Sequence, residues 1–209
     1  MSSGEYQYLE HRLVELRAQF VDFEIPLDRE PNSDELSNIA AFKLLIHAEV
    51  QTYIEDRIIR AINESVDEWC NKKQMSRCVL NLLLGWSDAS GGAEKYPTVH
   101  DISGLNRTIK MCANRVIREI SDNNGIKREA FLWLSFAAGI FSDEIDSTLL
   151  NELQSFGKAR GDVAHKSIGK VRTLYAPNIE AESAQNIVNL LGHFDNNLDS
   201  IDPKHPNVT

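Results

Sequence analysis

Basic charge, long apolar runs and strand-like alternation are all scarce in this chain, and each shortage excludes a class of protein. No apolar run reaches about 18 residues, so we expect no membrane span. The N-terminus lacks the basic patch and apolar core of a signal peptide, which predicts a cytoplasmic location. The three cysteines include no Cys-x-x-Cys pair and predict free, mostly buried thiols in a reducing cytosol.

The balance of charge argues against a surface that coats nucleic acid as a whole. The formal net charge is −9, whereas binding to a phosphate backbone depends on Lys and Arg. A local basic site remains compatible with this balance, because a cleft concentrates the field of its own charges. None of the six histidines forms a His-x-x-x-His pair or lies near a pair of cysteines. No metal site and no cofactor are therefore predicted.

Helical periodicity dominates the sequence and predicts an all-α fold, a helical bundle. Helices are expected near residues 5–20, 34–70, 74–86, 105–122, 126–140, 147–168 and 178–201, and the only strand candidate is 169–177. A linker near 87–102 could divide the chain, but neither half looks self-sufficient. We therefore expect one domain over 1–209, with a core at about 5–200 and a flexible tail at 201–209. The helix at 34–70 would span roughly 50 Å, which hints at a partner chain or a bundle with an overhang.

The segment 155–172 gathers positive charge in this otherwise acidic chain. Five basic side chains against Asp162 give it a local charge of +4. On an unbroken helix Arg160 and His165 would diverge by about 140°. Gly161 weakens the helix by about 1 kcal/mol relative to Ala, so either the helix bends there or a second copy helps each side chain to reach its target. A helix end whose cations complement the dipole is the structural alternative.

His47 is the histidine of the long predicted helix. Its neighbours are apolar, which favours a core histidine with a hydrogen-bond partner. A supporting role near an active site is the alternative.

Arg160, four residues and then His165 resemble the hallmark motif of the HEPN superfamily (higher eukaryotes and prokaryotes nucleotide-binding). The surrounding sequence resembles its RiboL-PSP-HEPN-like prokaryotic branch. The similar parts are NNGIKREAFLWLSFAAGI, the acidic SDEIDSTLLNELQSF and then GKARGDVAHKS. The segment IAAFKLLIHAEVQTYIEDRI also resembles the second helix of that branch. The resemblance covers roughly residues 5–200.

The resemblance implies a HEPN-like helical bundle that dimerises, with two Arg-His pairs facing each other across one composite cleft. It implies a metal-independent endoribonuclease of a prokaryotic toxin–antitoxin, stress or antiphage system, acting on RNA, with a cognate antitoxin or defence-system partner protein. We assign His165 as the proton shuttle and Arg160 as the phosphate anchor, since histidine exchanges protons near neutral pH and a guanidinium binds phosphate through several donors. Weaker candidates for RNA contact are Lys158, Asp162, Lys166, Ser167, Lys170 and Arg172.

The motif differs at two positions from the pattern that many HEPN toxins share. Many HEPN toxins carry Asn, Asp or His directly after the Arg, where this chain has Gly161, and the role of Asp162 stays open. Toxins silenced by nucleotidyl transfer carry a Tyr two residues after the His, where this chain has Ser167. The alternative function is a non-catalytic HEPN module that binds a nucleotide, RNA or a partner protein.

Overall fold

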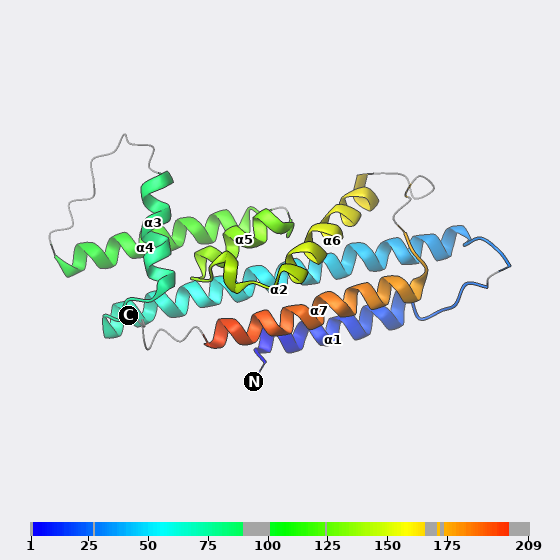
Figure 1. Ribbon diagram of the computed structural model, residues 1–209, viewed down its shortest axis with the longest axis horizontal. Helices are drawn as coiled ribbons and strands as arrows, with labels where there is room; N and C mark the ends of the chain where they lie inside the picture. The colour runs from blue at the N-terminus through cyan, green and yellow to red at the C-terminus, as the bar shows by residue number, and fades with distance from the viewer. Residues whose placement is uncertain are drawn as a thin grey trace. The chain divides into compact units, whose positions relative to one another are not determined.

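The chain folds into α-helices throughout the part that the computed structural model describes. This part comprises residues 2–26, 28–89, 101–123, 125–165, 171 and 174–200, with the backbone alone at 86–89, 199 and 200. The helices are α1 (Gly4–Phe20), α2 (Ser33–Lys72), α3 (Arg77–Ala89), α4 (Ile102–Ser121), α5 (Arg128–Ala137), α6 (Ser147–His165) and α7 (Pro177–Ser200), with a 3-10 turn, η1 (Ser142–Glu144), before α6 (Figure 1). No β-strand occurs in these ranges, which confirms the all-α prediction.

Side-chain caps fix where two of these helices begin. The Asn32 side chain accepts hydrogen bonds from the N–H groups of Asp34 and Glu35, both at 2.9 Å, and the Glu35 carboxylate accepts one from Asn32 N–H at 2.8 Å. This reciprocal capping box starts α2 where the sequence predicts it. Helix α4 begins three residues before its predicted start, because the Asp101 carboxylate accepts a hydrogen bond from Gly104 N–H at 2.7 Å.

The chain forms two compact units, and α2 contributes to both. The first unit is Met1–Ile54, Gly125–Arg128 and Asp146–Asn196, and the second is Glu55–Asn124, Glu129–Ile145 and Asn197–Thr209. Helix α2 has 40 residues and therefore a length of about 60 Å. Val50 and Ile54 in the first unit and Ile58 and Ile62 in the second are all 0% exposed. Each unit thus buries its own part of the long helix, and the single-domain expectation stays a prediction.

The first unit consists of α1, α6, the part of α2 up to Ile54 and the part of α7 up to Asn196 (Figure 1). A buried carboxylate ties three of its segments together. Asp195 is 0% exposed and accepts hydrogen bonds from Ser3 N–H and Ser3 Oγ, both at 2.7 Å, and from the Tyr53 hydroxyl at 3.2 Å. The Tyr6 hydroxyl donates to the carbonyl of Val188 at 3.1 Å. These bonds hold the start of α1 against α7.

The second unit contains α3, α4, α5, η1 and the rest of α2. Trp69 of α2 is buried and donates from Nε1 to Asn106 of α4 at 2.9 Å. The Cys78 thiol lies 3.2 Å from the carbonyl of Ala137, and burial raises its pKa to about 12. Cys78 and Cys112 are free and buried and Cys70 is free and half-buried, as the sequence predicts. A thiol with so high a pKa is unreactive at neutral pH.

Several predicted features lie outside the described residues. They are the tail at 201–209, most of the linker at 87–102 and most of the strand candidate at 169–177, whose described positions 171 and 174–176 form no strand. Of the helices in the described ranges, none combines the length and apolar character needed to cross a membrane.

Candidate functional site

Helix α6 carries both residues of the Arg-His motif in its last two turns. The helix begins after Asp146, whose carboxylate accepts a hydrogen bond from Thr148 N–H at 2.7 Å. Its apolar stripe is buried and consists of Leu149, Leu150, Leu153, Phe156 and Val163. The helix continues through Gly161 to His165 without a break. The sequence left open a bend at Gly161 or the help of a second copy. The bend is not observed.

Arg160 and His165 differ in their surroundings. Arg160 is half-buried, whereas His165, the last residue of α6, is exposed. Five residues of uninterrupted helix rotate the two side chains about 140° apart, which accounts for this difference. Within one chain, α6 therefore directs the two side chains to different sides.

His47 of α2 lies against the side of α6 that carries Arg160. Its ring stacks on Phe156 of α6, with centroids 5.3 Å apart and an interplanar angle of 21°. Phe156 and Arg160 are four residues apart, so they share one face of the helix. Burial is the main cause that lowers the pKa of His47 from 6.5 to about 4, and the positive charge of Arg160 adds to the shift. His47 is buried, as predicted, but no hydrogen-bond partner for its Nε2 is found among the described residues.

One turn before His47, α2 anchors the start of α7. Lys43 Nζ forms an ion pair with Glu180 Oε1 at 2.7 Å, and both side chains are almost fully buried. The same carboxylate oxygen accepts a hydrogen bond from Tyr175 N–H at 2.9 Å. His47 contacts α6, which precedes residues 166–173, and Lys43 contacts Tyr175, which follows them. Helix α2 therefore contacts the chain on both sides of 166–173.

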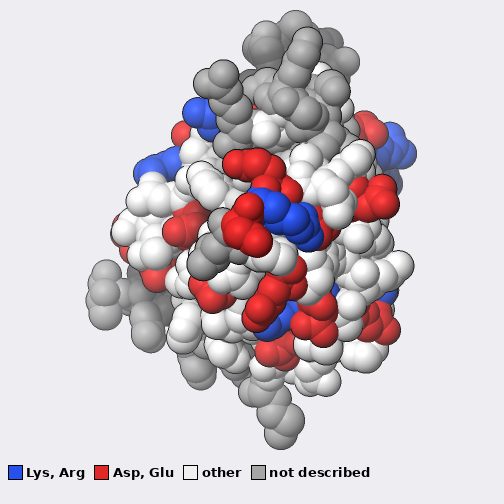
Figure 2. Space-filling model, turned by 90° about the vertical axis from the view of Figure 1, so that its right-hand side faces the viewer, with Lys and Arg blue, Asp and Glu red and all other residues white. Residues whose placement is uncertain are grey.

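The weaker candidates divide between described and undescribed residues. Lys158 is exposed and Asp162 half-buried, both on α6. Lys166, Ser167, Lys170 and Arg172 lie outside the described residues. On the face drawn in Figure 2, acidic side chains outnumber basic ones among the described residues. The described part of that face offers no continuous basic track for a phosphate backbone.

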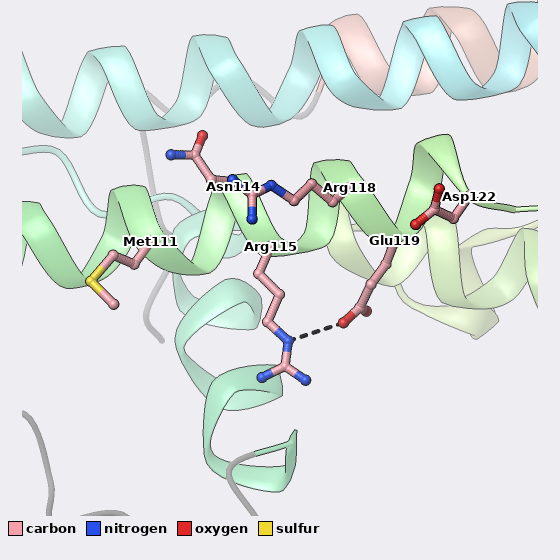
Figure 3. Close-up of a pocket in the computed structure, with 6 residues that line it drawn as sticks. All are labelled: Met111, Asn114, Arg115, Arg118, Glu119 and Asp122. Carbon is pink, nitrogen blue, oxygen red and sulfur yellow. Dashed lines mark hydrogen bonds and ion pairs between the residues drawn. The ribbon is translucent and has the colours of Figure 1, made fainter.

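A second feature, which the sequence did not single out, is a hollow on α4 in the second unit. It has a volume of about 450 Å³. The residues that line it are Met111, Asn114, Arg115, Arg118, Glu119 and Asp122 (Figure 3). Arg115 Nε pairs with Glu119 at 3.0 Å, while Arg118 points away from that pair (Figure 3). The sequence signal that could have located this hollow is a row of polar residues at three- and four-residue steps on the face of the helix opposite its apolar stripe.

No group of three or more His, Cys, Asp or Glu side chains within the described ranges could hold a metal ion. Comparisons of the chain with protein-family models, curated proteins and solved structures yield no match. The functional argument therefore depends on the residues of α6 and α2 themselves.

Proposed function

We propose that this chain is a HEPN-type endoribonuclease that acts as a homodimer in a prokaryotic toxin–antitoxin, stress or antiphage system. The observation that carries the proposal is the pair at the end of α6, where an exposed His165 follows a half-buried Arg160. The resemblance of the segment around this pair to the RiboL-PSP-HEPN-like branch supplies the reaction class.

The reaction is an attack of a ribose 2′-OH on the adjacent phosphorus. A bond forms from the 2′ oxygen to phosphorus, the bond from phosphorus to the 5′ oxygen breaks, and the products end in a 2′,3′-cyclic phosphate and a 5′-OH. As the proton shuttle, the imidazole of His165 accepts the proton of the 2′-OH and donates a proton to the leaving 5′ oxygen. The guanidinium of Arg160 stabilises the charge that develops on the phosphate oxygens.

A second copy of the chain supplies what one copy lacks. Since α6 directs Arg160 and His165 to different sides, one chain does not aim both at a single phosphate. Two copies that meet at the ends of their α6 helices bring two histidines and two arginines to one cleft. The exposure of His165 is compatible with such an interface.

Incubation of the purified protein with labelled RNA in EDTA tests this function. We expect fragments that end in a cyclic phosphate, and we expect Arg160→Ala and His165→Ala each to abolish them. His193→Ala is the matched control, because His193 is an exposed histidine of α7, and it should cleave like the wild type. Unchanged cleavage by both α6 variants would refute the site. A mobility shift of RNA without cleavage would identify the alternative, a non-catalytic binding module.

A further inference from the structure

Nε2 of His47 stands out among the buried polar atoms in the described part of the first unit. The residue is 2% exposed, and Nε2 has no hydrogen-bond partner among the described residues. Buried polar atoms of folded proteins are nearly always paired, because an unpaired one has lost its water without compensation. Such an atom can accept a hydrogen bond from a group that approaches it in another state of the molecule.

The surroundings of His47 identify that partner. The stacking contact with Phe156 fixes the plane of the imidazole against α6. Arg160 follows Phe156 by one helical turn on the same face, and it is half-buried. Its charge is close enough to depress the pKa of His47. Of the two motif residues, Arg160 is thus the one that lies on the face of α6 in contact with His47 and whose charge acts on it.

A neutral imidazole suits this task better than a carboxylate. A carboxylate would hold the guanidinium more tightly, but it would also cancel the charge that the phosphate needs. An uncharged imidazole nitrogen accepts one N–H of the guanidinium and leaves its positive charge available. With a pKa of about 4, His47 is neutral at physiological pH and is a poor general base.

We propose that His47 is a positioning residue for Arg160, accepting through Nε2 a hydrogen bond from the guanidinium when RNA occupies the site. This inference rests on the proposed function, since it assigns how the phosphate anchor is oriented. His47 does not touch the RNA itself. This hydrogen bond would fix the orientation of the guanidinium, so that its remaining N–H groups point at the scissile phosphate.

Two amide variants separate positioning from simple packing. The amide of Gln reaches about as far as Nε2, whereas the shorter amide of Asn reaches only the place of Nδ1. We expect His47→Gln to keep most of kcat, and His47→Asn to lose about 10- to 100-fold, as expected when a reacting group loses its orientation. KM should change less than kcat. His193→Asn on α7 is the matched control and should leave both constants unchanged.

A merely structural role would reduce the unfolding midpoint and kcat together and would not favour Gln over Asn. Both variants are therefore also unfolded in urea, and activity is compared below the transition. Equal activity of the Gln and Asn variants and the wild type, in a protein whose cleavage still needs Arg160 and His165, would overturn this inference alone. A wild type that neither binds nor cleaves RNA would overturn the proposed function, and the inference with it.

A spectroscopic readout supplements the kinetics. With a 2′-O-methyl RNA, which binds but lacks the attacking hydroxyl, the ¹⁵N resonance of His47 Nε2 should shift on binding. The shift should disappear in Arg160→Ala, even where this variant still binds the RNA at higher concentration. A shift that persists in Arg160→Ala would contradict the proposed hydrogen bond.

Discussion

Lys43 of α2 and Glu180 of α7 form an ion pair of 2.7 Å in which the two side chains are only 4% and 5% exposed. The Lys43 ammonium also lies 5.5 Å from the centre of the Tyr175 ring. Because Glu180 also accepts the Tyr175 N–H, the pair fixes the chain just after the basic segment. Removing one charge leaves the other buried in a poorly polar environment.

Lys43→Met should therefore destabilise the protein by about 3–5 kcal/mol, the usual effect of breaking a buried ion pair. The double variant Lys43→Met, Glu180→Leu should recover much of this loss, because no unpaired charge remains. Urea unfolding of the two single variants and the double variant measures the coupling. Strictly additive effects would show that the pair contributes nothing specific.

The low pKa of His47 predicts a dependence of stability on pH. The neutral form is favoured in the folded state, where the pKa is about 4, against 6.5 in the unfolded chain. Between these values the unfolded state binds the proton and the folded state does not, so stability is full above pH 6.5 and falls as the pH approaches 4. The loss should reach about 3 kcal/mol.

The comparison of wild type with His47→Gln isolates this contribution, because the other titrating groups are common to both proteins. Their difference in unfolding free energy should shrink or reverse between pH 6.5 and pH 4. Replacing Arg160 by Gln should raise the pKa of His47, since a neighbouring positive charge is removed. A difference that is flat across this range would refute the assignment of His47 as a buried neutral imidazole.

Two glycines of the first unit should respond oppositely to alanine. A Cβ at Gly192 would lie 2.6 Å from the Tyr6 hydroxyl oxygen, which is itself bonded to Val188, whereas a Cβ at Gly161 meets nothing within 4 Å. We expect Gly192→Ala to destabilise by about 1–3 kcal/mol through overpacking. Gly161→Ala should stabilise by about 0.5–1 kcal/mol through helix propensity. Thermal unfolding of both variants provides the measurement.

Gly161→Ala also tests how Arg160 and His165 reach one phosphate. If two copies supply the site, a stiffer α6 is compatible with the reaction, and cleavage of RNA should be retained. Loss of cleavage in a variant that is more stable than the wild type would indicate that α6 must open at Gly161 instead.

The helices were predictable because their signals are local. The stripe of Leu9, Leu13 and Leu16 and the cap at Asn32 lie within single elements, and both are found in the structure. The start of α4 was missed because Asp101 was not recognised as a cap. The two compact units were not predicted, because the periodicity of α2 is continuous across Ile54 and Glu55 and does not show where the packing partners change.

The candidate site was predictable in part for the same reason. Because Arg160 and His165 lie five residues apart on one helix, the divergence of their side chains could be calculated from the sequence. This calculation assumes a continuous helix, and α6 is continuous from Ser147 to His165. The contact of His47 with Phe156 joins residues that are more than 100 positions apart in the sequence. Burial of His47 could be inferred from its apolar neighbours. That Nε2 has no hydrogen-bond partner among the described residues depends on tertiary packing and could not be inferred.

The most direct test of the central claim is complementation between two inactive variants. Arg160→Ala retains His165, His165→Ala retains Arg160, and a mixed dimer of the two holds one intact side chain of each kind on opposite copies. After the variants are unfolded together and refolded, we predict RNA cleavage well above that of either variant alone. A site built from two copies would be contradicted if the wild type cleaves RNA as a strict monomer and the mixed variants cleave no better than either variant alone.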